Sequence, residues 1–254
     1  TQALLACRPR LNQAYDRLPV IEDFMNPTGR TLAPKAAAVT DGEVLLTVDS
    51  LAKDYVIKTG LFSRKTVHAV QDASFSLRRG ETLGVVGESG SGKSTLGLML
   101  AQLLQVTRGE VTLKGHTLVG QSAAQIRAMR KKVQIIFQNP YASLNPRFTV
   151  GRILEEPLKI HGLGGDEAAR QALVLEWLER VGLGAHALHK YPHEFSGGQR
   201  QRISIARSLI LQPEIVVCDE SVSALDVSVQ ATILNLLKDL QKEFSLAYLF
   251  ISHD

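Results

Sequence analysis

The sequence predicts an α/β fold with a parallel sheet at its core, an antiparallel strand portion and an inserted block of helices. The first observation is an apolar run at 82–86, followed by a glycine-rich loop and an apolar helical segment at 95–104. Strand, loop and helix in this order form a parallel α/β unit. The second observation is a set of further apolar runs at 133–137, 215–218 and 246–251, whose length suits buried strands of the same sheet.

The residues before this core predict the antiparallel portion. Residues 44–48, 67–77 and 111–113 have the pattern of strands, and a long polar loop at 58–65 separates the first two.

Helical spacing predicts an all-helical insertion at about 139–212. Apolar residues recur with helical spacing over 150–162, 167–181 and 197–211. We expect this insertion to lie within one domain that covers residues 44–254.

Residues 1–43 have a different character. A short helical pattern is followed by several prolines and an alanine run without periodicity, which is typical of a linker. The buried strand predicted at 246–251 stands almost at the end of the chain, so we expect the sequence to be part of a longer polypeptide.

Composition limits the classes of function. The chain has 254 residues, of which 44% are hydrophobic, and this suits a globular domain with a sizeable core. Its 29 basic and 25 acidic residues are well mixed, so no nucleic-acid surface is expected, and the mild positive charge suits a nucleotide or anionic lipid headgroups equally well.

The longest apolar stretches fall short of the roughly 20 residues of a membrane span. Cys7 and Cys218 are the only cysteines, and Cys218 lies in an apolar run. We therefore expect a buried thiol rather than a disulfide or metal ligand, and a reducing, cytoplasmic compartment.

A phosphate-binding loop follows the strand at 82–86. Its pattern is G-x-x-x-x-G-K-S/T, and its residues are Gly87, Glu88, Ser89, Gly90, Ser91, Gly92, Lys93 and Ser94, with Thr95 next in the predicted nucleotide-binding set. Successive backbone N–H groups and a helix N-terminus favour phosphate oxygens. We expect Lys93 to reach the β and γ phosphates of ATP and the Ser94 hydroxyl to bind Mg²⁺. The alternative is a merely flexible glycine turn.

An acidic pair closes the strand at 215–218. Asp219 and Glu220 stand at the carboxyl end of a parallel strand, where such sheets place their functional groups. We expect Asp219 to hold Mg²⁺ and Glu220 to act as general base toward water. The alternative is that both residues cap or solvate the following turn.

A second anion-binding turn lies between these two motifs. Ser196 is a natural N-cap for the helix that follows, and Gly197, Gly198 and Gln199 expose N–H groups at its start. Together with the phosphate loop and the acidic pair, in this order, the turn resembles the signature of the ATP-binding cassette (ABC) ATPases. The resemblance covers residues 44–254 and implies a P-loop NTPase (RecA-like) core, with ATP and Mg²⁺ as ligands.

The resemblance gives four other positions a role. Gln138 matches the glutamine that touches Mg²⁺ or the lytic water, and His253 matches the histidine that contacts the γ phosphate. Tyr55 matches the aromatic residue that stacks on adenine, and 223–226 match a loop that crosses the dimer interface. Without the family, Gln138 would be a loop hydrogen-bonder, His253 a solvated surface group and Tyr55 a half-buried sheet residue.

Longer strings narrow the resemblance. Residues 135–147, 191–195 and 222–229 resemble the ATPase subunits of oligopeptide and dipeptide importers, a group that includes peptide, glutathione and nickel systems. In this group 141–147 would dock a cytoplasmic helix of the permease, and the alternative is a rigid proline-bounded loop. One departure is Ser221, where the family usually has proline.

The family also implies partners. ATP would be sandwiched between the phosphate loop of one cassette and the Ser196 turn of another, so that binding closes the pair and hydrolysis opens it. We expect a second ABC cassette, two transmembrane permease subunits and a periplasmic or extracellular substrate-binding protein, with this chain peripheral at the cytoplasmic face of the membrane. Residues 1–5 with Pro9 resemble the closing helix of such an ATPase, which predicts a preceding cassette on the same polypeptide. An unrelated N-terminal helix is the alternative.

Two other classes stay open at this point. One is a soluble tandem ABC ATPase of translation or DNA repair; the linker argues against it, because it is rich in alanine and proline and is not a charged helix. The other is a nucleotide-binding regulatory module without turnover, against which Glu220 and His253 argue.

Overall fold

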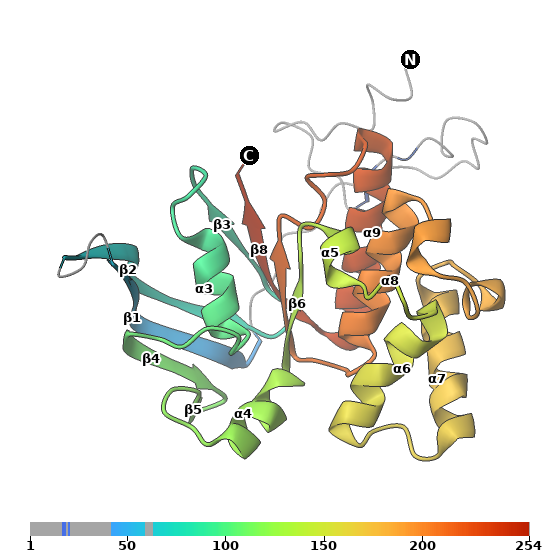
Figure 1. Ribbon diagram of the computed structural model, residues 1–254, viewed down its shortest axis with the longest axis horizontal. Helices are drawn as coiled ribbons and strands as arrows, with labels where there is room; N and C mark the ends of the chain where they lie inside the picture. Colours follow the sequence, from blue (N-terminus) through green and yellow to red (C-terminus); the bar gives the residue numbers. More distant parts are fainter. Residues whose placement is uncertain (1–16, 19, 21–41, 59–62, 254) are drawn as a thin grey trace. The chain divides into compact units, whose positions relative to one another are not determined.

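The computed structural model describes residues 17, 18, 20, 42–58 and 63–253 (Figure 1). The chain divides into two compact units. The sheet unit comprises residues 42–137, 211–220 and 245–254, and the helical unit comprises 1–41, 138–210 and 221–244. The predicted helix at the start of the chain, Cys7 and Pro9 lie outside the described residues.

The sheet unit contains a parallel sheet with the strand order β3-β8-β7-β6. The strands are β3 (Thr82–Val86), β6 (Val133–Ile136), β7 (Ile215–Asp219) and β8 (Ala247–Ser252). Every residue of β7 is buried, as expected for a central parallel strand. The four apolar runs of the sequence therefore form one sheet, as predicted.

An antiparallel sheet of order β2-β1-β4-β5 completes this unit. Its strands are β1 (Val44–Lys58), β2 (Arg64–Arg78), β4 (Arg108–Leu113) and β5 (His116–Thr117). The antiparallel prediction is confirmed, but β1 is longer than predicted, because its end pairs with β2 as a mostly exposed ribbon that lacks an apolar alternation.

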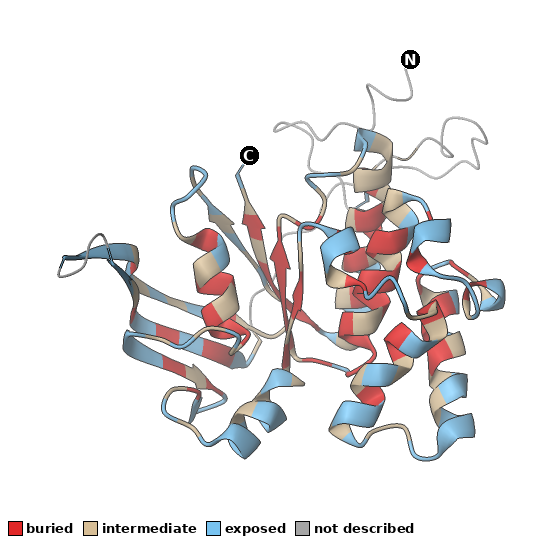
Figure 2. Cartoon of the chain, in the orientation of Figure 1, coloured by how far each residue is buried: buried red, intermediate tan, exposed pale blue. Residues whose placement is uncertain are grey.

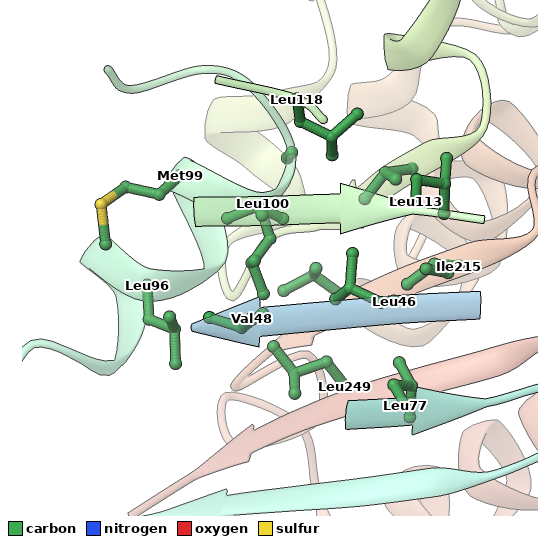
Figure 3. Close-up of a cluster of buried hydrophobic side chains, with 14 of the residues drawn as sticks. Leu46, Val48, Leu77, Leu96, Met99, Leu100, Leu113, Leu118, Ile215 and Leu249 are labelled. Atoms are coloured by element: carbon green, nitrogen blue, oxygen red, sulfur yellow. The ribbon is translucent and has the colours of Figure 1, made fainter. Parts of the chain in front are cut away.

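Helix α3 (Lys93–Leu100) packs against β2 and against strands of the parallel sheet. Met99 and Leu100 are fully buried in a cluster with side chains of both sheets, including Leu46, Leu113 and Leu249 (Figure 3). Burial of each such side chain contributes about 1.5–3 kcal/mol. The same helix therefore carries part of the core and begins at the phosphate loop.

A short helix, α4 (Ala123–Arg130), was not predicted. It has no buried residue, as Figure 2 shows, and its apolar stripe is short, with Ile126 and Met129 only half-buried. Its start is fixed by a capping box between Ser122 and Gln125.

The helical unit is organised around α8 (Gly197–Leu209), which contacts four other helices within the described residues. These are α5 (Pro140–Ser143), α6 (Val150–His161), α7 (Glu167–Arg180) and α9 (Val227–Phe244). Helices α6, α7 and α8 match the predicted segments, whereas α9 was not predicted. Two 3₁₀ turns, Ala185–Ala187 and Pro192–Glu194, lead from α7 to α8.

In the described part of the chain, no helix combines the length and the apolar character needed to cross a membrane. The prediction of a buried thiol is confirmed at Cys218, which is fully buried on β7.

Candidate functional site

The phosphate loop joins β3 to α3, as the sequence predicted. Lys93 is buried, and its ammonium donates hydrogen bonds of 2.7 Å to the carbonyls of Gly87 and Glu88, which closes the loop around it. Gly92 has a φ of 90°, and a Cβ there would lie 2.0 Å from the Ala69 carbonyl oxygen. Only glycine fits this position.

A pocket of about 450 Å³ lies beside the loop. Its lining residues are His68, Ala69, Val70, Gln71, Ala73, Val85, Val86, Gly90, Ser91, Gly92, Lys93 and Leu96. This volume falls in the range of small-molecule sites, and the start of α3 supplies a positive helix end to it. The site can thus hold an anion such as a phosphate group.

Ser94 and Asp219 meet in the sheet unit. The Ser94 hydroxyl donates a hydrogen bond of 3.0 Å to Asp219 Oδ1, which joins the start of α3 to the end of β7. The pKa of Asp219 is raised, first because the carboxyl is buried and further because of the charge of Glu220. The Ser94 hydrogen bond and the charge of Lys93 act in the opposite direction and lower the pKa.

The two oxygen groups fit the chemistry of Mg²⁺. This ion takes one or two protein oxygens together with water and phosphates. Within the described ranges, no group of three His, Cys, Asp or Glu side chains could hold a metal alone. A magnesium ion would therefore depend on Ser94, Asp219 and the nucleotide.

Glu220 and His253 are brought together by neighbouring strands. β7 and β8 pair in parallel, with Asp219 opposite Ile251, so the residues that follow both strands lie at the same edge. The His253 Nδ1 lies 3.2 Å from Glu220 Oε2. This arrangement can position a water molecule and accept its proton.

The departure at Ser221 has a structural counterpart. Glu220 has a φ of 46°, which is the left-handed region, and its N–H donates to the Ile251 carbonyl at 3.1 Å. A following proline would favour extended backbone at Glu220. Ser221 permits the left-handed conformation, and its own hydroxyl is buried without a hydrogen-bond partner.

The second anion turn begins α8. Ser196 is the N-cap; its hydroxyl accepts from the Gln199 N–H at 3.3 Å, and its N–H donates to Gln199 Oε1 at 2.9 Å. A Cβ at Gly198 would lie 2.4 Å from Val229 Cγ1, so the start of α9 also requires glycine at that position. The predicted N-cap is confirmed, and Gln199 completes a capping box.

A pocket of about 340 Å³ lies at this turn. Its lining residues are Val20, Gly182, Ser196, Gly198, Gln199, Arg202, Ser228, Val229 and Thr232. The turn therefore borders open space rather than packed side chains.

Gln138 lies in the helical unit. Its side-chain amide donates to the Ser223 hydroxyl at 3.3 Å, which joins the predicted glutamine to the start of the 223–226 loop. Its predicted roles toward Mg²⁺ and water stay predictions.

Tyr55 lies on β1 opposite Val67, with 38% of its surface exposed and the Lys53 ammonium 5.4 Å from the ring centroid. Its ring is accessible for stacking, and the adenine role stays a prediction. The pocket beside the phosphate loop is lined instead by His68, whose Nδ1 lies 2.7 Å from Asp54 Oδ1. Sequence reasoning missed His68, because nothing distinguishes it within its strand.

Comparison with known proteins defines the class. Residues 70–223 match the ABC transporter family, and the chain belongs to it. The chain is 50% identical to the glutathione import ATP-binding protein GsiA of Salmonella typhimurium and 48% identical to that of Escherichia coli K12, in each case over 262 aligned residues that include all of this chain. It spans 42% of the length of these relatives.

Two solved structures of ABC proteins have a similar fold. The ATP-binding cassette MJ0796, in a dimeric post-hydrolysis state bound to ADP and Pi, has a TM-score of 0.73 and 29% identity, covering 83% of this chain and 88% of that one. The cbiO1 protein of Clostridium perfringens, part of the ABC transporter complex cbiONQ, has a TM-score of 0.71 and 26% identity, covering 84% and 79%. These likenesses confirm the P-loop NTPase fold.

Proposed function

We propose that this chain is an ATP-hydrolysing cassette of an importer for peptides or peptide-like compounds, with glutathione in the same chemical class. The observation that carries the proposal is the junction of Ser94 with Asp219 and of Glu220 with His253 at one edge of the parallel sheet. The relatives support import, because they are named glutathione import ATP-binding proteins. The soluble class in translation or DNA repair gains no support from them.

The residues act on ATP in distinct ways. The loop N–H groups and Lys93 bind the phosphates, and Lys93 exchanges its two carbonyl contacts for phosphate oxygens. Ser94, Asp219 and Gln138 would hold Mg²⁺, which neutralises charge on the phosphates. Glu220 orients the attacking water and accepts its proton, while His253 holds Glu220 and faces the γ phosphate.

The Ser196 turn serves a second cassette. Its N-cap geometry presents N–H groups at the start of α8 beside an open pocket, which suits the γ phosphate bound by a partner's loop. Loss of that phosphate on hydrolysis removes the link between the cassettes. The partners proposed are a second cassette on the same polypeptide, two permease subunits and a substrate-binding protein outside the membrane, with this chain peripheral at its cytoplasmic face.

The test uses the complete importer in proteoliposomes. Wild type is expected to hydrolyse ATP and to respond to the substrate-loaded binding protein. Lys93→Ala should lower nucleotide affinity and hydrolysis by at least about 100-fold, because two phosphate contacts are lost. The control is Lys65→Ala, a change at an exposed lysine on β2, which should behave as wild type. Recovery of the protein with soluble partners only, or unchanged hydrolysis in Lys93→Ala, would contradict the proposal.

A further inference from the structure

Arg200 holds the backbone just before the signature turn. It lies on α8 one turn after Ser196, and its side chain runs back toward the start of the helix, as helical side chains do. Its Nε donates to the Phe195 carbonyl at 2.8 Å, and its Nη2 donates to the same oxygen. Only 7% of Arg200 is exposed. Movement of this guanidinium would therefore move the residue that precedes Ser196.

The flat face of the guanidinium is covered by Tyr141. The Arg200 Cζ lies 3.5 Å from the centroid of the Tyr141 ring, which is a close cation–π contact. The Nη1 is buried without a hydrogen-bond partner, so the guanidinium makes its polar contacts through Nε and Nη2 alone. Tyr141 itself is 63% exposed on α5. One aromatic side chain thus joins the surface of α5 to a buried arginine.

A second arginine of α8 contacts the C-terminal end of α5. Arg207, two turns further along α8, donates to the carbonyl of Ser143. Burial lowers the pKa of Arg207, while the charge of Glu156 raises it. Because α5 is held by α8 at Tyr141 and at Ser143, it cannot shift without disturbing one of these contacts.

We propose that Tyr141 and Arg200 form a positioning link that transmits displacement of α5 to the Ser196 turn. The proposal rests on the proposed function, in which two permease subunits are partners, and on the expectation from the family resemblance that residues 141–147 dock a permease helix. A docked helix that turns the exposed Tyr141 ring changes the support of the guanidinium, and the forked contact with the Phe195 carbonyl passes this change to the N-cap. Arginine suits this role and lysine does not, because only the planar fork donates twice while it stacks.

The experiment measures ATP hydrolysis by the complete importer in proteoliposomes, with and without its substrate-loaded binding protein. Tyr141→Leu removes the π face and keeps an apolar side chain, and Tyr141→Phe keeps the face. The control is Phe148→Leu, which breaks another arginine–aromatic stack, with Arg152 of α6 at 3.7 Å. Thermal unfolding of each variant shows that it is folded.

Tyr141→Leu should reduce the stimulated kcat about fivefold, as expected from loss of one cation–π contact, with the KM for ATP changed by less than about twofold. Tyr141→Phe and Phe148→Leu should behave as wild type. The link is overturned if the stimulated kcat of Tyr141→Leu equals that of wild type. It is also overturned if Tyr141→Phe or Phe148→Leu lowers the stimulated kcat as much as Tyr141→Leu does.

A second variant tests the pair directly. Arg200→Lys should lower stimulation as Tyr141→Leu does, and the double variant should be no worse than either single variant, because both break one link. Additive losses would overturn the link. A wild-type importer that hydrolyses no ATP would instead contradict the proposed function.

Discussion

The imidazole of His253 lies against the carboxylate of Glu220, with 3.2 Å between Nδ1 and Oε2, although 32 intervening residues separate them in the sequence. The contact exists because β7 and β8 are neighbours in a parallel sheet and both end at the same edge. Ser94 and Asp219 meet at the same place. The chemistry proposed for this chain depends on that edge.

Gly198 is expected to tolerate no side chain. Gly198→Ala would place a Cβ 2.4 Å from Val229 Cγ1 and should destabilise the protein by about 1–3 kcal/mol through overpacking. Val229→Ala should restore most of this loss when combined with it, because the clashing methyl group is removed. The measurement is the free energy of unfolding in denaturant for the single and double variants. A double variant as unstable as Gly198→Ala would contradict the clash.

Glu214 is the centre of an ion-pair cluster in the sheet unit. Although burial raises its pKa, the hydrogen bond and charge of Lys114 and the charges of Lys132 and Arg79 outweigh this and lower it. A carboxyl with a lowered pKa stabilises the fold above its ordinary pKa, and this stability is lost as the pH falls through the folded value. Glu214→Gln should therefore cost about 1–2 kcal/mol at pH 7.

The stability difference between wild type and Glu214→Gln should shrink as the pH falls toward the lowered folded pKa of Glu214, because the protonated carboxyl is neutral like the glutamine amide. Denaturant unfolding from pH 7 down to about 3, below the ordinary glutamate value, tests this. Glu110→Gln is the control, since Glu110 is exposed on β4. A stability difference that does not shrink between pH 7 and about pH 3 would contradict the assignment to ionised Glu214.

We expect Asp219 to lower the stability of the nucleotide-free protein and to be needed for binding of ATP with Mg²⁺. Its raised pKa, caused first by burial, means that ionised Asp219 opposes folding, and that its contribution is best at low pH and is lost as the pH rises through the folded value. Asp219→Asn should raise the melting temperature of the nucleotide-free protein at pH 7 by about 2–4 °C. It should also abolish the further stabilisation by ATP with Mg²⁺. The measurement is thermal unfolding of wild type and Asp219→Asn with and without these ligands. A melting temperature of ligand-free Asp219→Asn below that of wild type would contradict this prediction.

Asn235 fastens the segment before the sheet unit to α9. Its buried side-chain amide accepts from the Leu18 N–H at 2.9 Å and donates to the Leu18 carbonyl at 2.8 Å. Asn235→Leu should speed amide hydrogen exchange at Leu18 by about tenfold, the factor for roughly 1.4 kcal/mol. Asp239→Asn, which removes only the exposed ion pair with Arg17, should have a much smaller effect. Equal exchange in wild type and Asn235→Leu would exclude this anchor.

Much of the fold could be predicted because buried strands and helices require apolar residues at regular positions in the sequence. The parallel strands are apolar runs with clear ends, and α6, α7 and α8 show apolar periodicity. Helix α4 could not be found this way, since it buries no residue, although Ser122 and Gln125 carried a capping signal. The end of β1 was missed because exposed residues on a paired ribbon need no alternation.

The candidate site divides in the same way. The phosphate loop, the acidic pair and the Ser196 turn are local patterns, so their positions could be predicted from the sequence, and the family resemblance supplied the role of the Ser196 turn. The contact of Arg200 with Tyr141 and that of His68 with Asp54 arise only from tertiary packing, and no local pattern announces them. The left-handed backbone at Glu220 likewise depends on the hydrogen bond to Ile251.

The rate of ATP hydrolysis by Glu220→Gln in the complete importer tests the central claim most directly. Loss of the proposed general base should lower kcat by about 10²–10⁴-fold, with ATP affinity retained and an ATP-bound, closed cassette pair accumulating. Glu110→Gln should hydrolyse ATP as wild type does. Turnover in Glu220→Gln equal to that of wild type would contradict the assignment of this edge as the catalytic site.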